Sequence, residues 1–303
     1  MPCCHSKRSG LDVSNHQTDI ETVALLGLGL MGGSLAAGIR GSGAPIRIQA
    51  YARREATRRE GMEKGYADAV HDHPAEAVAG ADIVVCCLPV CAIPGVVKNC
   101  LPGLSGDATL TDVGSTKVQL QAQLEALLVG GAAYVGSHPM CGSEQAGLAA
   151  VDPGLYAEAC VVVVPPRQEA AGPHLERVRA LWTLLGAEIL ELDAATHDRL
   201  VARTSHLPHL VAAALVAAVS EDGVSDELRA LCGKGFRDTT RIAAGSPEMW
   251  GDIVSSNREH IRGALVGMQR QLQHIVDLMD DEEMETLASY LDETAGMRKA
   301  LRE

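Results

Sequence analysis

Short apolar runs alternate with helical patterns through residues 22–193. Continuous or alternating apolar runs predict strands at Thr22–Gly27, Ile46–Tyr51, Ala81–Leu88, Ala108–Asp112, Ala132–Val135 and Cys160–Val164. Apolar residues at helical spacing predict helices between them, at Gly29–Ile39, Glu55–Lys64, Pro74–Ala79, Ala92–Leu101, Thr116–Val129 and His174–Leu185. Strands that alternate with helices indicate an α/β fold with a doubly wound parallel sheet, and strands that are apolar throughout are typical of a sheet covered on both faces.

The strand pattern stops after Asp193, and helical patterns follow. They cover Ala194–Ser220, Ser225–Arg241, Pro247–Ser256, Asn257–Met279 and Asp281–Lys299. We therefore expect a flexible tail at residues 1–20, a domain built on the parallel sheet at residues 21–193, and an all-helical domain at residues 194–303. This second domain is the expected place for substrate binding and dimerisation.

One helical segment has apolar residues at heptad spacing. They follow one another at intervals of 4, 3, 4, 3 and 4 residues: Ile261, Leu265, Met268, Leu272, Ile275 and Met279. This spacing fits the core-facing side of a single helix, and it also fits a helix that pairs with another across a dimer.

A glycine loop lies between the first predicted strand and the first predicted helix. Its residues are Gly27, Leu28, Gly29, Leu30, Met31 and Gly32, in the pattern GxGxxG. In this context the glycines allow a tight turn, a close approach of the backbone to a pyrophosphate, and close packing of helix on strand. The free N–H groups of the helix N-terminus face the phosphates. The first domain is therefore expected to be a Rossmann-type, dinucleotide-binding domain.

The end of the second strand bears on which dinucleotide binds. NAD sites usually carry an acidic residue there, which binds the ribose hydroxyls, but this chain has Ala52, Arg53 and Arg54. Guanidinium groups can pair with a 2′-phosphate, so the sequence favours NADP, with NAD as the alternative. Leu88 and Pro89, after the fourth strand, are expected near the nicotinamide ribose.

Charge and composition exclude several classes of protein. The net charge is −13 and aromatic residues make up 3% of the chain, so nucleic acid is a poor partner. We expect no membrane span, because the apolar stretch Val23–Ile39 is interrupted by glycines, and no signal peptide, because the N-terminus has no apolar core. Cysteines within apolar runs suggest a reducing, cytoplasmic location. The terminal Cys3, Cys4 and His5 make a poor metal site, because a frayed terminus has no fixed geometry.

Polar clusters stand out against this apolar background. They are DVGSTK (112–117), GSHPMCGSE (136–144), SHLPH (205–209) and GFRDTTRIA (235–243). Together with GLGLMGGSLA (27–36), they occur in the order and approximate spacing of the prephenate/arogenate dehydrogenase family of tyrosine biosynthesis, which the chain resembles over residues 22–290. The resemblance implies the oxidative decarboxylation of a cyclohexadienol: hydride leaves ring C4 for the nicotinamide, the 4-hydroxyl loses its proton, and CO₂ departs.

The resemblance assigns roles to individual residues. It implies that His138 is the catalytic histidine, that Ser115 orients the substrate hydroxyl and the histidine, and that Arg241 binds a substrate carboxylate. A neutral imidazole suits the proton acceptor, and a guanidinium suits the carboxylate. The remaining substrate contacts that it implies are Ser205, His206, His209, Glu144 and Trp250, and the family places an aromatic contributed by the partner subunit at the position of Trp250.

Several of these residues also have plain structural interpretations. His138 could be a turn residue before Pro139, and Arg241 a surface charge. His206 and His209 could be hydrogen-bonded core histidines; a metal site is disfavoured because no further ligand joins them. Lys117 could be a helix-end charge or a partner of Asp112. Cys141 stands where many relatives carry Ala, and a reactive thiol there is disfavoured.

The sequence leads to prephenate as the expected substrate, with arogenate, or dual use of both, as the alternative. Remote alternatives are a β-hydroxyacid dehydrogenase, which the glycine loop alone would fit, and a non-catalytic NADP-binding regulator. The family's fused chorismate mutase and ACT-type regulatory domains are not expected. The expected partners are the small-molecule substrate and a second copy of the chain.

Overall fold

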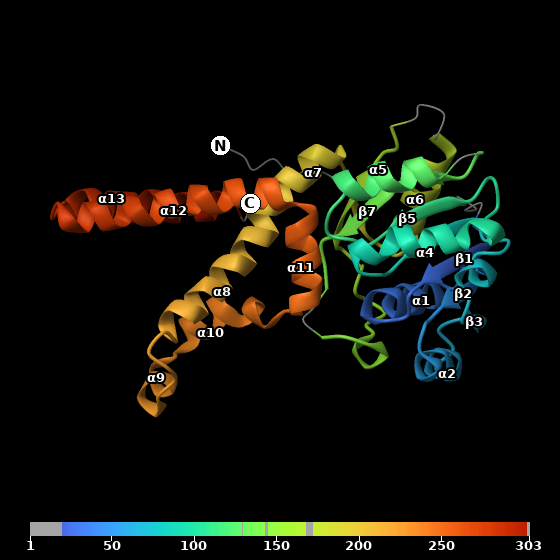
Figure 1. Cartoon of the computed structure of the whole chain (residues 1–303), viewed down its shortest axis with the longest axis horizontal. Helices are drawn as coiled ribbons and strands as arrows, with labels where there is room; N and C mark the ends of the chain where they lie inside the picture. The colour runs from blue at the N-terminus through green and yellow to red at the C-terminus, as the bar shows by residue number, and fades with distance from the viewer. Residues whose placement is uncertain (1–19, 129, 143–144, 168–171, 302–303) are drawn as a thin grey trace, which may run out of the picture. The chain divides into compact units, whose positions relative to one another are not determined.

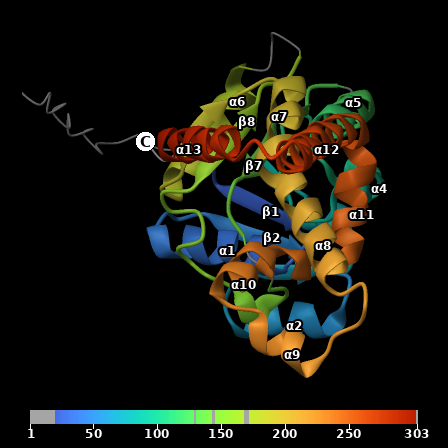
Figure 2. The ribbon, with the colours of Figure 1, turned by 90° about the vertical axis from the view of Figure 1, so that its left-hand side faces the viewer.

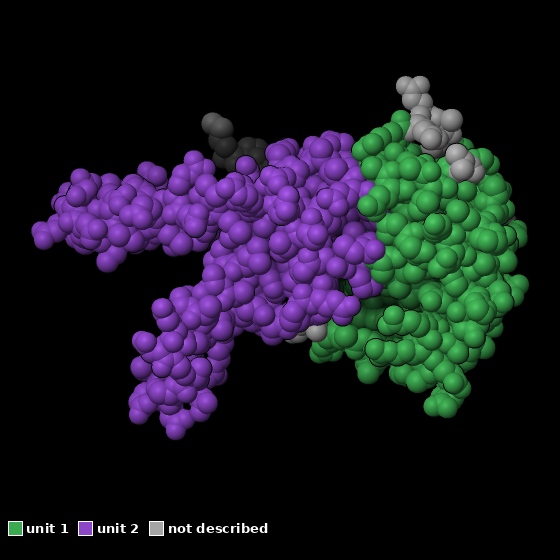
Figure 3. Space-filling model, viewed as in Figure 1, with its two compact units in different colours: residues 1–88, 92–114, 121–191 green, residues 89–91, 115–120, 192–303 purple. Residues whose placement is uncertain are grey.

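The computed structural model describes residues 20–128, 130–142, 145–167 and 172–301. The chain forms two compact units (Figure 3). Unit 1 comprises residues 1–88, 92–114 and 121–191, and unit 2 comprises residues 89–91, 115–120 and 192–303. The units are not two contiguous stretches, because two short segments of the first half belong to unit 2. Cys3, Cys4 and His5 lie outside the described residues.

The main sheet of unit 1 is parallel, with strand order β3-β2-β1-β4-β5-β6. Its strands are β1 (Thr22–Leu26), β2 (Arg47–Tyr51), β3 (Ala69–His71), β4 (Ile83–Cys86), β5 (Thr109–Asp112) and β6 (Ala133–Tyr134). This order confirms the expected doubly wound sheet. All six strands are parallel, but β2 and β3 are added on one side of β1 and β4, β5 and β6 on the other. In such sheets ligands bind beyond the carboxyl ends of the strands at the point where the order changes side, here between β1 and β4.

Helices cover this sheet (Figure 1). They are α1 (Leu30–Ser42), α2 (Glu55–Glu63), α3 (Pro74–Ala77), α4 (Ile93–Cys100), α5 (Val118–Leu127) and α6 (Gly172–Leu184). Val23 and Leu25 of β1 belong to the core that contains residues of α1 and α6. Ala24 and Leu26 point to the opposite face and are fully buried too, because side chains alternate along a strand. The sheet is therefore covered on both faces, as the apolar strands predict.

A second, smaller sheet belongs to unit 1. It consists of β7 (Gly136–Pro139), β8 (Cys160–Val164) and β9 (Glu188–Glu191), with β7 and β8 antiparallel and β8 and β9 parallel. No strand was predicted from the sequence at residues 136–139, and the alternative of a turn at His138 is wrong. Residues 136–139 are all buried, so they form a strand although Ser137 and His138 are polar.

Unit 2 is helical, as expected (Figure 2). It contains α7 (Ala194–Val201), α8 (Leu207–Val219), α9 (Asp226–Leu231), α10 (Lys234–Thr240), α11 (Pro247–Ser256), α12 (Arg258–Asp280) and α13 (Met284–Ala300). Two of the expected helices are interrupted. A π-helical turn, Ala202–His206, separates α7 from α8, and the non-helical residues Cys232 and Gly233 separate α9 from α10.

The π turn has a visible cause. The N–H of Leu207 bonds to the carbonyl of Ala202, five residues earlier, and the next residue, Pro208, has no N–H to donate. A proline inside a helix removes one bond and crowds the preceding turn, and a wider turn accommodates it. π turns of this kind are frequent at functional sites, and this one carries Ser205 and His206.

The heptad-spaced residues of α12 pass from core to surface. Ile261 is buried with Ala202 and Ile253, whereas Leu272 and Met279 are 52% and 57% exposed. α12 and α13 lie side by side, where Tyr290 donates to Gln271 at 3.2 Å. The N-terminal half of the seam is therefore core, and the C-terminal half is an exposed apolar surface of the described chain.

Among the described residues, one helical stretch is long and apolar enough to cross a membrane by length and composition alone. It is Ala194–Val219, where the sequence predicted a helix but no membrane span. Of its most apolar part, 28% is buried. Core helices of other proteins pass the same test, so this finding is weak evidence for a membrane span.

Candidate active site

The glycine loop has the geometry of a phosphate cradle. Gly27 has φ +110°, and a Cβ there would lie 2.5 Å from the carbonyl oxygen of Cys87. A Cβ on Gly32 would lie 2.0 Å from the carbonyl oxygen of Gly27, so helix α1 packs directly on the loop. At Gly29, by contrast, a Cβ would meet nothing within 4 Å, and no side chain caps α1 there. The helix N-terminus thus opens onto free space, which fits a dinucleotide pyrophosphate.

The other loop residues support this cradle. Leu28 is buried in the core, and the Tyr156 hydroxyl donates to the carbonyl of Met31 at 2.7 Å. Leu30 and Met31 are half-buried. Leu88 approaches the loop from the end of β4, since its Cδ2 lies 3.0 Å from the Cβ position of Gly27. Pro89 is exposed and belongs to unit 2.

The turn after β2 carries two exposed cations. Arg53 and Arg54 are exposed, and neither side chain has a hydrogen bond or ion pair to another described residue. A third arginine, to which the sequence pattern gave no role, orders this turn: Arg58 Nη1 donates to the carbonyls of Ala52 at 3.1 Å and Arg53 at 3.0 Å. The Arg58 side chain thus holds the turn through its carbonyls, and the two guanidinium groups before α2 remain open to a ligand.

His138 lies on strand β7, where it pairs with Val162 of β8, and it is 8% exposed. Its neighbour Ser137 fixes the strand. The Ser137 N–H donates to Asp112 Oδ1 at 3.2 Å, and the Ser137 hydroxyl lies 2.8 Å from that of Thr111. His138 is therefore set in a rigid strand rather than in a turn.

Asp112 also belongs to this region, although the sequence indicated it only as a partner of Lys117. It is fully buried at the end of β5. Oδ1 also accepts from the Tyr134 hydroxyl at 2.7 Å, and Oδ2 accepts from the N–H of Gly114 at 2.8 Å. One carboxylate thus holds the backbone of β7 next to His138 and the turn that precedes Ser115. Only the contact between β5 and β7, which belong to different sheets, reveals this role.

A second cluster lies in unit 2. The structure brings together His206, His209 and Trp250: His209 stacks on Trp250 with ring centroids 3.5 Å apart, and His206 meets the same indole edge-on at 6.0 Å. This stacking lies within one chain. A contribution of Trp250 to a partner's site stays a prediction.

Both histidines are buried, His206 with 1% and His209 with 7% exposed. Burial lowers the pKa of His206 to about 4 and also lowers the pKa of His209. Both imidazoles are therefore neutral at neutral pH. The Nε2 atom of His206 is buried and has no hydrogen-bond partner among the described residues, and an unpaired buried polar atom is uncommon in a folded protein.

The remaining predicted residues are placed as follows. Arg241 is exposed at the start of a 3₁₀ turn, Arg241–Ala244, and Ser115 is half-buried; both belong to unit 2. Lys117 is fully buried rather than exposed at a helix end. Burial raises the pKa of the Cys141 thiol to about 11, which disfavours a thiolate. Glu144 lies outside the described residues.

The predicted site residues among the described part of the chain thus fall into two groups, one in each unit. Unit 1 holds the glycine loop, the arginines after β2 and His138. Unit 2 holds Ser115, Arg241 and the cluster of His206, His209 and Trp250, with Ser205 in the π turn. No group of three or more His, Cys, Asp or Glu side chains among the described residues could hold a metal ion.

The strand order and the glycine loop define unit 1 as a dinucleotide-binding domain. Comparison with known proteins specifies the family. Residues 35–191 match the family model of the prephenate dehydrogenase nucleotide-binding domain, and residues 193–293 match that of the prephenate dehydrogenase dimerization domain. The chain belongs to the prephenate dehydrogenase family, and it is an NAD(P)-dependent oxidoreductase.

Individual relatives resemble almost the whole chain. A cyclohexadienyl dehydrogenase from Zymomonas mobilis is 29% identical over 94% of this chain and 97% of its own. A crystal structure of prephenate dehydrogenase from Aquifex aeolicus, in complex with hydroxyphenyl propionate and NAD⁺, is 31% identical with a TM-score of 0.86, covering 94% of this chain and 99% of that one. A Synechocystis arogenate dehydrogenase is 28% identical with a TM-score of 0.78, covering 92% and 99%.

Proposed function

We propose that this protein is a prephenate dehydrogenase that converts prephenate to 4-hydroxyphenylpyruvate in tyrosine biosynthesis. The observation that carries the proposal is the placement of His138: a nearly buried imidazole on a rigid strand, in the same unit as the open glycine cradle. Arogenate, which would give tyrosine directly, is the alternative substrate, and a dual cyclohexadienyl dehydrogenase is a third possibility within the same chemistry.

The residues supply the parts that the reaction needs. The bound dinucleotide supplies the acceptor for the hydride that leaves ring C4. His138 accepts the proton of the 4-hydroxyl, and Ser115 orients that hydroxyl. As the C4–H bond breaks, the C4 carbonyl forms. The C1 carboxylate then leaves as CO₂, and its bonding electrons complete the aromatic ring and move onto the C4 oxygen, which takes back a proton from His138 to give the phenol. Because the product ring is aromatic and CO₂ is lost, the step is effectively irreversible.

Substrate recognition is assigned to unit 2. Arg241 binds a carboxylate through a two-bond fork. In this proposal Ser205, His206, His209 and Trp250 contact the substrate tail, and Glu144 is assigned to substrate binding by the family resemblance alone. A neutral His209 is supported by its lowered pKa, and the unpaired Nε2 of His206 is a free buried position for a substrate oxygen.

We further propose NADP as the preferred cofactor, with NAD as the alternative. The support is the pair of exposed guanidinium groups, Arg53 and Arg54, at the position where an NAD site usually has a carboxylate. A 2′-phosphate is a doubly charged ligand for which two arginines are suited.

The protein is also proposed to act as a cytoplasmic homodimer. The exposed C-terminal half of the heptad seam on α12 supports the dimer, because Leu272 and Met279 are apolar side chains that a second copy of the helix could cover. The cysteines among the described residues are free thiols, which suits a reducing compartment.

The test is an assay of the purified protein with each substrate and each cofactor. Reduced nicotinamide is followed by absorbance, and the aromatic product by chromatography. We expect turnover with prephenate and NADP⁺, with one molecule of CO₂ released per hydride transferred. If neither prephenate nor arogenate reduces either cofactor, the proposed function is wrong.

A further inference from the structure

Ser115 belongs to unit 2, although the longer stretches of chain before and after its short segment belong to unit 1. The chain leaves unit 1 after Gly114, contributes residues 115–120 to unit 2, and returns to unit 1 at Gln121. The position of the Ser115 hydroxyl therefore depends on what anchors this short segment in unit 2.

A buried carboxylate anchors the segment. Asp198 on α7 is 1% exposed. Its Oδ1 accepts the N–H of Lys117 at 2.8 Å, and its Oδ2 accepts the N–H of Val118 at 2.9 Å. These are N–H groups at the N-terminus of α5, which have no partner within the helix itself. Asp198 does for α5 what an N-cap residue does, from a position 80 residues away in sequence.

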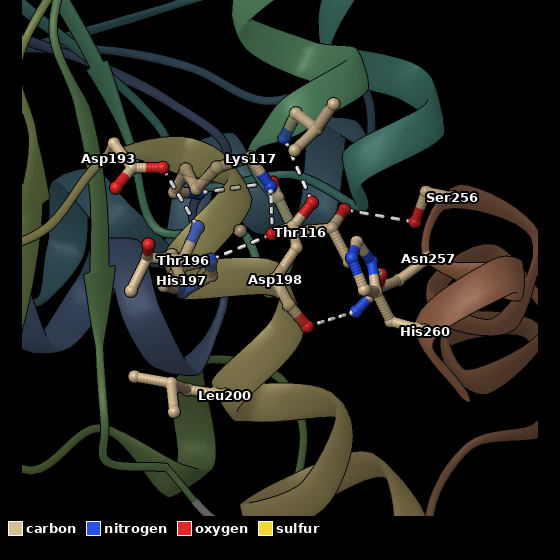
Figure 4. A network of polar contacts seen from close by, with 12 residues as sticks. Thr116, Lys117, Asp193, Thr196, His197, Asp198, Leu200, Ser256, Asn257 and His260 are labelled. Carbon is tan, nitrogen blue, oxygen red and sulfur yellow. Dashed lines mark hydrogen bonds and ion pairs between the residues drawn. The ribbon is translucent and has the colours of Figure 1, made fainter. Parts of the chain in front are cut away.

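Further bonds hold Asp198 and the segment in place (Figure 4). The ring nitrogen Nδ1 of His197 lies 2.8 Å from Asp198 Oδ1, and Asn257 Nδ2 donates to the Asp198 carbonyl at 2.8 Å. The Thr116 hydroxyl donates to that of Ser256 at 2.9 Å. The segment is thus tied at three successive residues, 116, 117 and 118, immediately after Ser115.

We propose that Asp198 is a positioning residue that acts through Ser115: by holding the N–H groups of Lys117 and Val118, it fixes the hydroxyl of Ser115 for the reaction. The inference rests on the proposed function, in which Ser115 orients the substrate hydroxyl. Asp198 does not touch the reacting atoms in this proposal, and its effect reaches them through the backbone of three residues.

The conservative variant is Asp198→Asn. An amide has one acceptor oxygen in place of two, and its NH₂ group would face an N–H donor of the segment, so one of the two backbone bonds is lost. A small misplacement of a reacting group can lower a rate by about 100-fold. We expect Asp198→Asn to lower kcat by about 10- to 100-fold, with the Kd of NADP⁺ unchanged, because the cradle lies in unit 1.

Asp193→Asn is the matched control. Asp193 lies on the same stretch of chain and also caps a helix, since its Oδ1 accepts the N–H of Thr196 at 2.9 Å, but it holds its own helix α7. We expect its kcat to stay within about twofold of the wild type. An equal loss of kcat in both variants would mean that helix capping in general, and not the hold on Ser115, matters, and would overturn the proposal.

A double-mutant cycle with Ser115→Ala separates positioning from a structural role. If Asp198 acts through Ser115, Asp198→Asn lowers kcat far less in the Ser115→Ala background than in the wild type. If the two losses multiply, the inference is wrong even though the proposed function stands. Should Asp198→Asn fail to fold, Ser256→Ala replaces it in the same cycle, with the exposed neighbour Ser255→Ala as its control.

A readout without turnover completes the test. Hydrogen exchange of the amides of Lys117 and Val118 reports the two bonds directly. We expect faster exchange in Asp198→Asn and unchanged exchange in Asp193→Asn. Unchanged exchange in both would overturn the proposal, and absence of activity in the wild type would instead overturn the proposed function.

Discussion

The imidazole of His209 lies flat on the indole of Trp250, with ring centroids 3.5 Å apart and an angle of 11° between the planes. Gly245 closes one side of this pair: a Cβ there would lie 2.6 Å from Trp250 Nε1 and 3.0 Å from His209 Cε1. The backbone of Gly245 has φ −61°, a value that any residue adopts, so the glycine is needed for space rather than for conformation.

Gly245→Ala should therefore displace the stacked pair. Overpacking of this kind typically destabilises by about 1–3 kcal/mol. Because His209 and Trp250 are proposed substrate contacts, we expect KM for prephenate to rise by about tenfold and kcat to change less. Steady-state kinetics measure both. Gly251→Ala is the matched control, since a Cβ there meets nothing within 4 Å; the same KM rise in both variants would contradict the prediction.

Replacing His138 by Asn should remove the proposed proton acceptor while keeping a polar side chain of similar size. General-base catalysis typically contributes a factor of about 10²–10⁴, so we expect kcat to fall by that amount. The Kd of the dinucleotide, measured by fluorescence titration, should stay unchanged. His73→Asn, at a side chain 73% exposed in unit 1, is the control. Full turnover in His138→Asn would exclude the assigned role.

Arg53→Ala should weaken the binding of NADP⁺ more than that of NAD⁺. A hydrogen bond to a charged group contributes about 1.5–3 kcal/mol, so the Kd of NADP⁺ should rise at least about tenfold. Titration of both dinucleotides measures the effect. Arg59→Ala serves as control, because Arg59 on α2 is exposed and pairs with Glu63. If both dinucleotides weaken equally in Arg53→Ala, the arginine does not read the 2′-phosphate.

Because His206 is buried in its neutral form, we expect the free energy of unfolding to decrease in acid. Its pKa is about 4 in the folded protein and about 6.5 in the unfolded chain. As the pH falls below about 6.5, the unfolded chain binds the proton first, so the free energy of unfolding decreases until the pH reaches about 4 and is not regained below it. The decrease is on the order of 3 kcal/mol at most.

Urea unfolding across this pH range measures that decrease. His206→Gln cannot take up a proton, so its stability should depend less on pH than that of the wild type. His274→Gln, at an exposed histidine of the same unit, should keep the wild-type dependence. If the free energy of unfolding depends on pH equally in all three proteins, His206 is not the source of the acid destabilisation.

A charge on the exposed part of the α12 seam should dissociate the proposed dimer. Leu272→Glu places a carboxylate where an apolar contact is proposed, and burying an unpaired charge is strongly unfavourable. Light scattering should then give a 31.8 kDa species in place of twice that mass. Arg270→Glu, on the opposite side of the helix, is the control. A wild-type protein that is monomeric at all concentrations would remove the proposal of a dimer.

The local parts of the fold could be predicted from the sequence. The glycine loop follows a strand and opens a helix within six residues, Gly27–Gly32, and the structure confirms the parallel sheet and the helical second unit. Apolar runs and helical spacing are short-range signals. These signals were enough to predict the fold class, because strands that are buried on both faces can be arranged with the helices between them in few ways.

The parts that were missed depend on contacts between distant residues. Strand β7 contains Ser137 and His138 and has no strand-like pattern; it forms because β8 pairs with it and Asp112 bonds its backbone. Asp198 has no unusual neighbours in sequence, and its role depends on a segment 80 residues earlier. The break between α9 and α10 and the π turn after α7 are likewise local departures that periodicity does not register.

The π turn at Ala202–His206 also bears on how this region can change in evolution. Because the turn is wider than an α-helical one, everything after it is rotated about the helix axis relative to an unbroken helix. Deleting one residue there would swing His209 away from Trp250 while leaving α7 untouched. Length changes in this turn are therefore expected to be rarer among functional homologues than changes of residue type.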